Sequence, residues 1–288
     1  MTTTRVAVLM TCHNRRKKTL FSLEAVYKQE VPLEVKVQVY LVDDGSTDGT
    51  AEAVAANYKE VKVLQGDGRL FWNGGTRLAF AEAIKHNYDY YLWLNDDTVL
   101  YPETLGTLLA TSRRLVEQGY VRAIVTGSTC DPKTGALTYG GVVRSIWWRP
   151  LSFRLVEPDQ DPKLCDTMNG NCVLIPEEVV KVVGNLDPVF NHFLSDHDYG
   201  LRAQQHGCTI WVAPGYAGTC LPNPSAGRMA DSDLSLRKQW QKIDEPKGLA
   251  LKDATLVPFK QWKVFAKRHG GPFWPIYWLL PYRRLLWS

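Results

Sequence analysis

The sequence lacks the features that mark a secreted, disulfide-stapled or membrane-spanning protein. Its six cysteines form no CxxC pair and no compact disulfide-like spacing, and Met1–Arg5 lead into a strand pattern without an apolar signal region. No apolar run reaches the roughly 20 residues that a membrane-spanning helix needs. We therefore expect a reducing, cytoplasmic compartment.

A strong excess of charge of one sign is also missing. The 34 basic and 30 acidic residues give a net charge of +4. This excess is too small and too interspersed for nucleic acid to be the main partner. It belongs to the C-terminal tail, because residues 260–288 contain six Lys or Arg and no acid.

What the chain does contain is an alternation of strand-like and helix-like segments. Strands are expected at 5–10, 35–42, 61–65, 90–94, 123–128 and 171–176, and helices at 19–28, 51–56, 76–86, 177–183 and 196–206. This order predicts an α/β fold with a mostly parallel central sheet flanked by helices. We expect two halves built on the same sheet (1–100 and 101–230) and a helical, aromatic C-terminal extension (231–288).

Polar side chains follow three of the expected strands. They are the run 12–15, the pair Asp43-Asp44 and the run Asn95-Asp96-Asp97. Ligands of parallel sheets bind outside the carboxyl ends of the strands. We therefore expect these clusters to meet in one crevice.

The run Asn95-Asp96-Asp97 is the strongest candidate metal site. Mg²⁺ and Mn²⁺ prefer oxygen ligands and typically take one or two carboxylates plus phosphate oxygens. The alternative is a turn or helix cap before Pro102, where Asn and Asp are favoured in any case.

Asp43 and Asp44 are candidates for binding a nucleoside. Two adjacent like charges are costly without a partner, which favours a binding role over a plain turn. Such carboxylates accept hydrogen bonds from a base N–H or a ribose hydroxyl. The glycine-rich run 66–75, which includes Gly74, lets backbone approach a diphosphate closely. Arg77 could reach the same diphosphate or be a solvated helix position.

Several motifs together resemble glycosyltransferase family 2 enzymes of the GT-A fold, over roughly residues 5–215. They occur in the family's order at 11–15, 42–48, 74–79, 94–98, 168–176 and 193–207. The first acid of the family's DxD motif is Asn95 here, as in the rhamnosyltransferase-like branch.

The resemblance implies that 1–100 is a nucleotide-sugar-binding half, with a donor site for a nucleotide-diphosphate sugar. It also implies that 101–230 is an acceptor-binding half with the catalytic base. His13, Asn14 and Arg15 would line the nucleotide pocket, and Asp43 or Asp44 would hold the base and ribose. Asp96 matches the middle of the DxD motif. Asp97 matches its last acid, the expected ligand of Mn²⁺ or Mg²⁺.

Asp196 aligns with the family's catalytic base. The spacing Ser195-x-x-Asp198 is typical of a capping box, so a helix is expected to begin here, and its N-terminus would keep Asp196 ionised. Asp198 is either a residue of the acceptor site or an i,i+4 partner of Arg202.

One position departs from the family pattern. Cys220 stands five residues before Ser225, where many relatives have a metal-coordinating His. A thiolate would add little to a Mg²⁺ or Mn²⁺ site. We therefore expect Asp97 and the donor diphosphate to hold the metal.

The resemblance predicts an inverting glycosyltransferase that acts on a glycan or lipid-linked glycan, in polysaccharide or glycolipid assembly. Trp147 and Trp148 have flat faces that suit acceptor sugars, although an aromatic packing cluster is an equal alternative. Other readings remain open: a retaining transferase, a nucleotidyltransferase on a similar sheet, or a catalytically silent sugar-nucleotide or glycan-binding protein.

The tail 260–288 mixes aromatic and basic residues, a composition typical of segments at a membrane surface. Pro272, Pro275 and Pro281 exclude one long helix, so short helical pieces are expected. We predict contact with the inner face of the membrane. The alternatives are packing on the catalytic domain and a dimer contact. The oligomeric state stays open.

Overall fold

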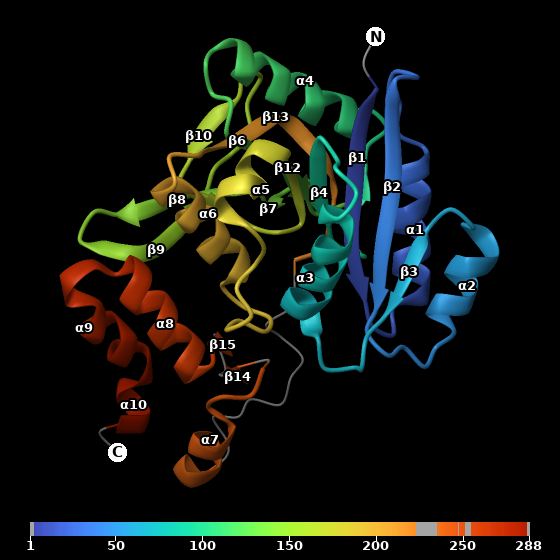
Figure 1. The fold of residues 1–288 in the computed structure, drawn as a ribbon. Helices are drawn as coiled ribbons and strands as arrows, with labels where there is room; N and C mark the ends of the chain where they lie inside the picture. The colour runs from blue at the N-terminus through green and yellow to red at the C-terminus, as the bar shows by residue number, and fades with distance from the viewer. Residues whose placement is uncertain (1–2, 223–234, 247, 251–254, 287–288) are drawn as a thin grey trace.

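The computed structural model describes residues 3–222, 235–246, 248–250 and 255–286. Its centre is a ten-stranded mixed sheet with helices on both faces (Figure 1). The main path of the sheet runs β10-β13-β6-β12-β4-β1-β2-β3. The predicted α/β fold with a helix-flanked central sheet is confirmed.

The N-terminal part of the sheet is parallel, as its βαβ pattern predicts. Its strands are β1 (Thr4–Cys12), β2 (Val35–Asp43), β3 (Lys62–Gln65) and β4 (Tyr90–Leu94). The connecting helices are α1 (Arg16–Tyr27), α2 (Thr50–Asn57) and α3 (Phe71–Ile84). β1 lies between β2 and β4, so the carboxyl ends of these three strands share one edge.

The second part of the sheet is mixed. It consists of β5 (Val99–Leu100), β6 (Ala123–Cys130), β7 (Leu137–Tyr139), β10 (Lys163–Cys165), β12 (Cys172–Pro176) and β13 (Thr209–Thr219). β12 runs antiparallel between β4 and β6, whereas β13 is parallel to β6. Strands of both predicted halves therefore share one sheet.

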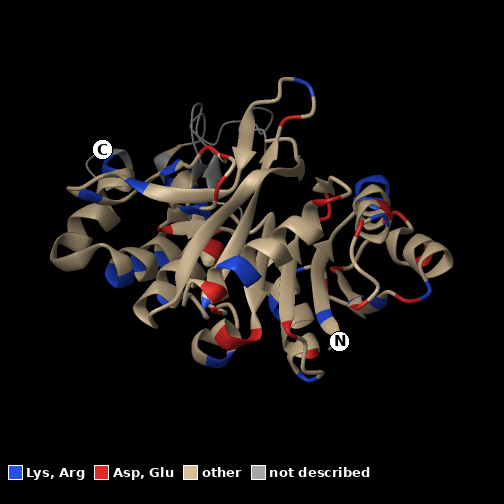
Figure 2. Ribbon diagram, turned by 90° about the horizontal axis from the view of Figure 1, so that it is seen from above, with Lys and Arg blue, Asp and Glu red and all other residues tan. Residues whose placement is uncertain are grey.

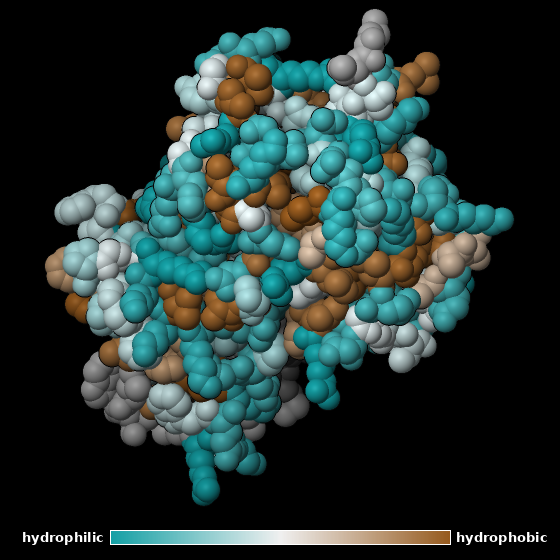
Figure 3. Space-filling model, viewed as in Figure 1, coloured by the Kyte–Doolittle hydropathy of each residue, from teal (hydrophilic) through white to brown (hydrophobic). Residues whose placement is uncertain are grey.

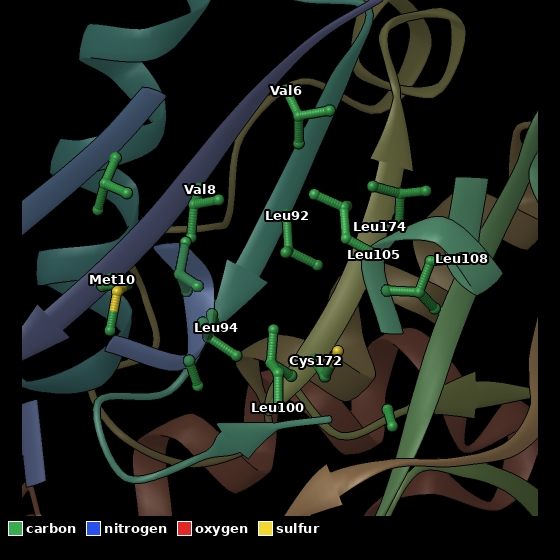
Figure 4. Packing of buried hydrophobic residues seen from close by; sticks show 14 of the residues in the cluster. Val6, Val8, Met10, Leu92, Leu94, Leu100, Leu105, Leu108, Cys172 and Leu174 are labelled. Atoms are coloured by element: carbon green, nitrogen blue, oxygen red, sulfur yellow. The ribbon is translucent and has the colours of Figure 1, made fainter. Parts of the chain in front are cut away.

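Each face of the sheet carries its own hydrophobic core, because successive side chains of a strand point to opposite faces. Val6, Val8 and Met10 of β1 pack with α1 and α4 (Thr104–Glu117) on one face. Figure 4 shows these side chains beside those of β4, β12 and α4. Ala7 and Leu9 point to the other face. There they meet α3, α5 (Glu177–Val183) and α6 (Ser195–Gln205).

A small second sheet and a helical C-terminal region complete the fold. The second sheet contains β8 (Gly141–Ile146), β9 (Arg149–Leu155) and β11 (Thr167–Met168). The C-terminal elements are α7 (Leu236–Lys242), β14 (Leu249–Ala250), β15 (Thr255–Leu256), α8 (Phe259–His269), η2 (Gly271–Phe273), α9 (Trp274–Leu279), η3 (Leu280–Tyr282) and α10 (Arg283–Leu286). The predicted short helical pieces are thus present.

Part of the aromatic tail packs inward. Phe265 of α8 is fully buried against Phe190 and Leu201, and Tyr282 is buried beside Ile243. Trp287 of the predicted tail lies outside the described residues. Within the described chain, no helix combines the length and the apolar character that crossing a membrane requires.

Candidate active site

A cavity of about 570 Å³ opens at the carboxyl ends of β1 and β4. Its lining contains the polar residues that follow these strands, together with segments from the second half of the chain. The lining residues are Thr11, Cys12, His13, Arg15, Asp44, Gly68, Phe71, Trp72, Asn95, Asp96, Asp97, Tyr139, Asn171, His192, Cys220, Glu245 and Pro246. The clusters after β1, β2 and β4 therefore converge on one cavity.

Two basic residues neutralise the acid pair after β4. Arg15 Nη1 lies 3.0 Å from Asp96 Oδ1 and 3.0 Å from Asp97 Oδ2, and Lys18 Nζ lies 3.3 Å from the same Asp97 oxygen. Burial raises the pKa of Asp96 to about 7, against the opposing effect of Arg15. Asp96 Oδ2 is buried and has no hydrogen-bond partner among the described residues.

The acid pair fits a hard divalent cation that shares its coordination with phosphate. Such an ion needs only one or two protein carboxylates, and Asp96 keeps one carboxylate oxygen without a partner among the described residues. Within the described residues, no three His, Cys, Asp or Glu side chains form a complete metal cage. A metal would therefore depend on donor oxygens.

Cys220 contributes little as a ligand. Its Sγ lies 3.7 Å from Asp97 Oδ1 and 3.5 Å from Asn171 Nδ2. Burial, followed by the charge of Asp97, raises the pKa of this thiol to about 11, so it is protonated at neutral pH. Protonated sulfur is a poor ligand for Mg²⁺. Ser225 lies outside the described residues.

Asp44 organises the glycine-rich segment from the wall of the cavity. Its Oδ1 accepts the Gly68 N–H at 2.8 Å and its Oδ2 accepts the Phe71 N–H at 3.0 Å. A Cβ at Gly66 would lie 2.5 Å from Asp44 Oδ1, so this close approach requires glycine. Asp43 is buried and accepts the Ser46 N–H, which closes the turn after β2.

His13 and Asn14 join the loops after β1 and β2. His13 Nδ1 donates to the Asp44 carbonyl at 2.6 Å. Asn14 has a φ of +52°, and its Oδ1 accepts the Thr47 N–H at 2.7 Å. His13 and Arg15 line the cavity, whereas Asn14 supports the loop behind them.

Asp196 lies in the first turn of α6, which begins at Ser195 as predicted. Its Oδ2 accepts the Gly170 N–H at 3.0 Å. The predicted capping box is wrong, because Ser195 Oγ is buried without a partner in the described chain and Leu194, with a φ of +68°, precedes the helix. Asp196 is half-buried, adjoining the cavity through Gly170 and Trp72.

Asp198 lies in a buried ion network. Its carboxylate is 2.8 Å from Arg202 Nε, 3.0 Å from Arg268 Nη1 and 2.9 Å from His269 Nε2. Burial acts to raise its pKa, but the hydrogen bonds from His269 and Arg202 outweigh it and the pKa is lowered. The predicted i,i+4 pair with Arg202 is confirmed, and the network attaches α8 to α6.

Four other predicted residues are not among those that line the cavity. A Cβ at Gly74 would meet Leu70 of its own helix region, and Arg77 Nε donates to the Leu186 carbonyl at 2.9 Å. Trp147 and Trp148, at the tip of the β8–β9 hairpin, are 92% and 50% exposed. Acceptor or diphosphate binding by these four residues stays a prediction.

Several residues that line the cavity were not predicted from the sequence. Asn171 precedes β12, and the antiparallel direction of that strand brings this residue to the carboxyl end of β4, where the Asn95 N–H donates to its carbonyl. Trp72 lies in the first turn of α3, and Glu245 lies in the C-terminal region. Two of them had a local signal, since Trp72 lies within the glycine-rich run and Asn171 within the family motif at 168–176.

Comparisons with known proteins identify a family and two relatives. The family model described as Glycosyl transferase family 2 matches residues 7–180. Two curated relatives, both named N-acetylglucosaminyl-diphospho-decaprenol L-rhamnosyltransferase from Mycobacterium tuberculosis strains, are 24% identical over 195 residues. The match covers 60% of this chain and 63% of each relative, so it spans less than two thirds of their length.

Solved structures share the fold. S. aureus TarS matches with a TM-score of 0.56 and 16% identity, over 91% of this chain and 42% of that one. The mannosyltransferase PcManGT from Pyrobaculum calidifontis, in complex with GDP-Man and Mn²⁺, matches with a TM-score of 0.53 and 16% identity, over 94% and 67%. Because the family model covers more than half of the chain, this protein belongs to glycosyl transferase family 2 and has the GT-A fold.

Proposed function

We propose that the protein is an inverting glycosyltransferase that moves a sugar from a nucleotide-diphosphate sugar to an acceptor hydroxyl. One observation carries the proposal. The cavity has the acid pair Asp96-Asp97 on one wall, and Asp196 adjoins it through Gly170 and Trp72. In this arrangement Asp96 and Asp97 could act on the leaving group, and Asp196 could act on the attacking hydroxyl.

The donor nucleotide would occupy the side formed by His13, Arg15 and Asp44. These residues offer hydrogen-bond donors and an acceptor at the carboxyl ends of the strands, the usual ligand position of such sheets. Arg15 also lies next to Asp97, within reach of a diphosphate placed there. Its guanidinium suits bidentate contact with phosphate oxygens.

Asp97 and Asp96 would hold Mn²⁺ or Mg²⁺ together with the donor diphosphate. Such an ion supplies Lewis-acid stabilisation of the charge that develops on the leaving diphosphate. The mannosyltransferase neighbour was solved with Mn²⁺. Burial raises the pKa of Asp96 and so disfavours its ionised form, which a bound cation would stabilise.

Asp196 would act as the general base. The acceptor oxygen forms a bond to the anomeric carbon, the bond from that carbon to the diphosphate oxygen breaks, and the hydroxyl proton passes to Asp196. The Gly170 N–H donates to this carboxylate and holds it in place at the start of α6. General-base assistance of this kind contributes roughly 10²–10⁴ in rate.

We further propose a lipid-linked glycan acceptor, used at the inner face of the membrane. The curated relatives are named for an acceptor on decaprenol. In this chain Phe273, Ile276 and Leu280 of the tail are 62%, 58% and 46% exposed, and Lys263 and Lys267 are exposed on the preceding helix. Figure 2 shows the Lys and Arg of these helices near the C-terminus.

The β8–β9 hairpin belongs to the same proposed membrane surface. It lies beside α8 and α9 in Figure 1, and Tyr277 Oη donates to the Trp148 carbonyl at 2.8 Å. Trp147 and Trp148 therefore extend the exposed apolar side chains of the tail. In Figure 3 brown and teal atoms are intermixed over this part of the molecule. Such mixtures suit the headgroup region.

The central experiment is a donor screen. Thermal unfolding is measured with UDP-, dTDP- and GDP-sugars in the presence of Mn²⁺, because a ligand that binds only the folded state raises the melting temperature. The donor with the largest shift is then used to label acceptor glycans. We expect transfer with inversion at the anomeric carbon. Stabilisation without transfer would identify a sugar-nucleotide-binding protein, and retention would reject Asp196 as the base.

A further inference from the structure

We propose that Trp72 is the platform against which the transferred sugar ring packs, and that Asn95 is a positioning residue that fixes the indole for this contact. The inference rests on the proposed transfer reaction. In that reaction Trp72 would recognise the sugar, without transferring a proton or binding the metal.

Three features restrain the side chain of Trp72, which lines the cavity. Its Nε1–H donates to Asn95 Oδ1 at 2.7 Å. The indole of Trp93 packs edge-on against it, with ring centroids 6.0 Å apart. The preceding Phe71 has a φ of +54°, and its N–H is fixed by Asp44. A half-buried ring whose orientation is restrained in this way is preorganised for a ligand.

Gly170 shows how close the indole comes to the candidate base. A Cβ at Gly170 would lie 2.3 Å from Trp72 Cζ2 and 2.5 Å from Cη2, so only glycine allows this approach. The same Cβ would lie 3.4 Å from Asp196 Cβ, and the Gly170 N–H donates to Asp196 Oδ2. The six-membered ring of Trp72 therefore lies next to Asp196.

The indole spans the distance that the chemistry needs. Its nitrogen end touches Asn95, beside the acids proposed to hold the diphosphate, and its other end adjoins Asp196. In-line displacement places the attacking and leaving oxygens on opposite sides of the anomeric carbon. The reacting sugar therefore lies alongside the indole. Aromatic walls bury the apolar surface of a ligand, while a few polar groups orient it.

The structure also gives Asn95 a reason to replace an acid. Its amide oxygen accepts the indole proton without adding a third negative charge beside Asp96 and Asp97. An aliphatic residue would leave the Trp72 N–H unpaired and the ring less firmly oriented. Asn95 thus acts through Trp72 rather than on the substrate.

Calorimetry with Mn²⁺ on matched ligand pairs tests the platform. The pairs are UDP and UDP-glucose, dTDP and dTDP-rhamnose, and GDP and GDP-mannose, and the pair that binds the wild type most tightly is taken forward. Trp72→Ala is expected to leave the Kd of the nucleoside diphosphate within about twofold. It should remove the affinity that the sugar adds and lower the kcat/KM of transfer about tenfold or more.

The control and the outcomes separate this inference from the proposed function. Trp211→Phe removes another indole whose Nε1 donates to a side chain, Thr209 Oγ1 on β13, and should leave kcat/KM unchanged. If Trp72→Ala binds the nucleotide and transfers sugar like the wild type, the platform is rejected while the transferase stands. If the wild type binds no nucleotide, both are rejected.

A double-mutant cycle tests the role of Asn95. Asn95→Leu should lower kcat/KM in the wild-type background. In Trp72→Phe, which has no indole N–H, the same change should have little further effect, within about twofold. Equal losses in both backgrounds would show that Asn95 acts independently of Trp72 and would overturn the positioning role.

Discussion

Individual residues of the site differ in how well the sequence predicted their position. Arg15, Asp44, Asp96 and Asp97 line the cavity because each closely follows a strand of the parallel sheet, a relation readable from the βαβ pattern. Arg77 had no such constraint. Its contact with the Leu186 carbonyl depends on how a distant loop folds over α3, which no local pattern encodes.

Asp196→Asn is expected to preserve donor affinity and to lower kcat by about two to four orders of magnitude, the range for loss of a general base. The amide keeps the size of the side chain and an oxygen that can accept the Gly170 N–H. Single-turnover transfer kinetics measure the effect. Asp159→Asn, at an exposed site paired with Lys163, is the control. Wild-type turnover in Asp196→Asn would move the base elsewhere.

Asp97→Asn is expected to abolish the Mn²⁺-dependent part of donor binding and to leave folding intact. The residue lies at a cavity wall, where Arg15 and Lys18 lose a charge partner but remain in contact with solvent. Calorimetry with and without Mn²⁺ provides the measurement, and Asp161→Asn on the surface is the matched control. An unchanged metal effect would remove Asp97 from the site.

Among the elements, the βαβ units were predictable and β12 was only partly so. The strand at 172–176 was recognised from its apolar residues. Its antiparallel direction was not, because a strand buried on both faces reads the same whichever way it runs. The contact between α6 and α8 was equally hidden, since it joins Asp198 to residues about 70 positions away.

Asp198→Asn should destabilise the junction of α6 and α8. Removing one partner of a buried pair typically costs 3–5 kcal/mol, and we expect about 2–3 kcal/mol because Arg268 is partly solvated. Chemical denaturation gives the free energy of unfolding. Lys260→Ala, which breaks a surface pair with Asp244, should change it by less than about 1 kcal/mol.

The Asp198 carboxylate also predicts that the free energy of unfolding depends on pH. The pKa of Asp198 is lower in the folded state than its ordinary value of 3.8, so its stabilisation is fully present above about pH 4. It is lost as the pH falls through the folded-state pKa. The stability difference between wild type and Asp198→Asn should therefore shrink below pH 4. A difference that stays constant down to pH 2 would contradict this assignment.

At the scale of the whole molecule, charge and apolar surface are distributed unevenly. The cavity opens at the carboxyl ends of β1 and β4, whereas the exposed apolar residues of the tail stand beside the exposed lysines of α8. The sequence indicated the tail through its composition. It did not indicate the hairpin, since the contact between Tyr277 and Trp148 joins segments far apart in the chain.

The double variant Phe273→Ser, Ile276→Ser is expected to lose most of its binding to vesicles that contain anionic lipid, because the exposed apolar side chains enter the headgroup region. Cosedimentation at low and high salt measures the binding, which should weaken with salt. Leu33→Ser removes an equally prominent apolar side chain, 91% exposed, from the loop before β2. Equal binding by all three proteins would reject the membrane surface.

The position of β12 also affects how the protein folds during synthesis. About 80 residues separate the end of β4 from the strand that pairs with its edge. At 5–20 residues per second, the ribosome needs roughly 4–16 s to supply them. During that time the nascent N-terminal βαβ units present an open, apolar strand edge, which invites aggregation. We therefore expect early chaperone engagement in cells, and insolubility of a fragment that ends near residue 100.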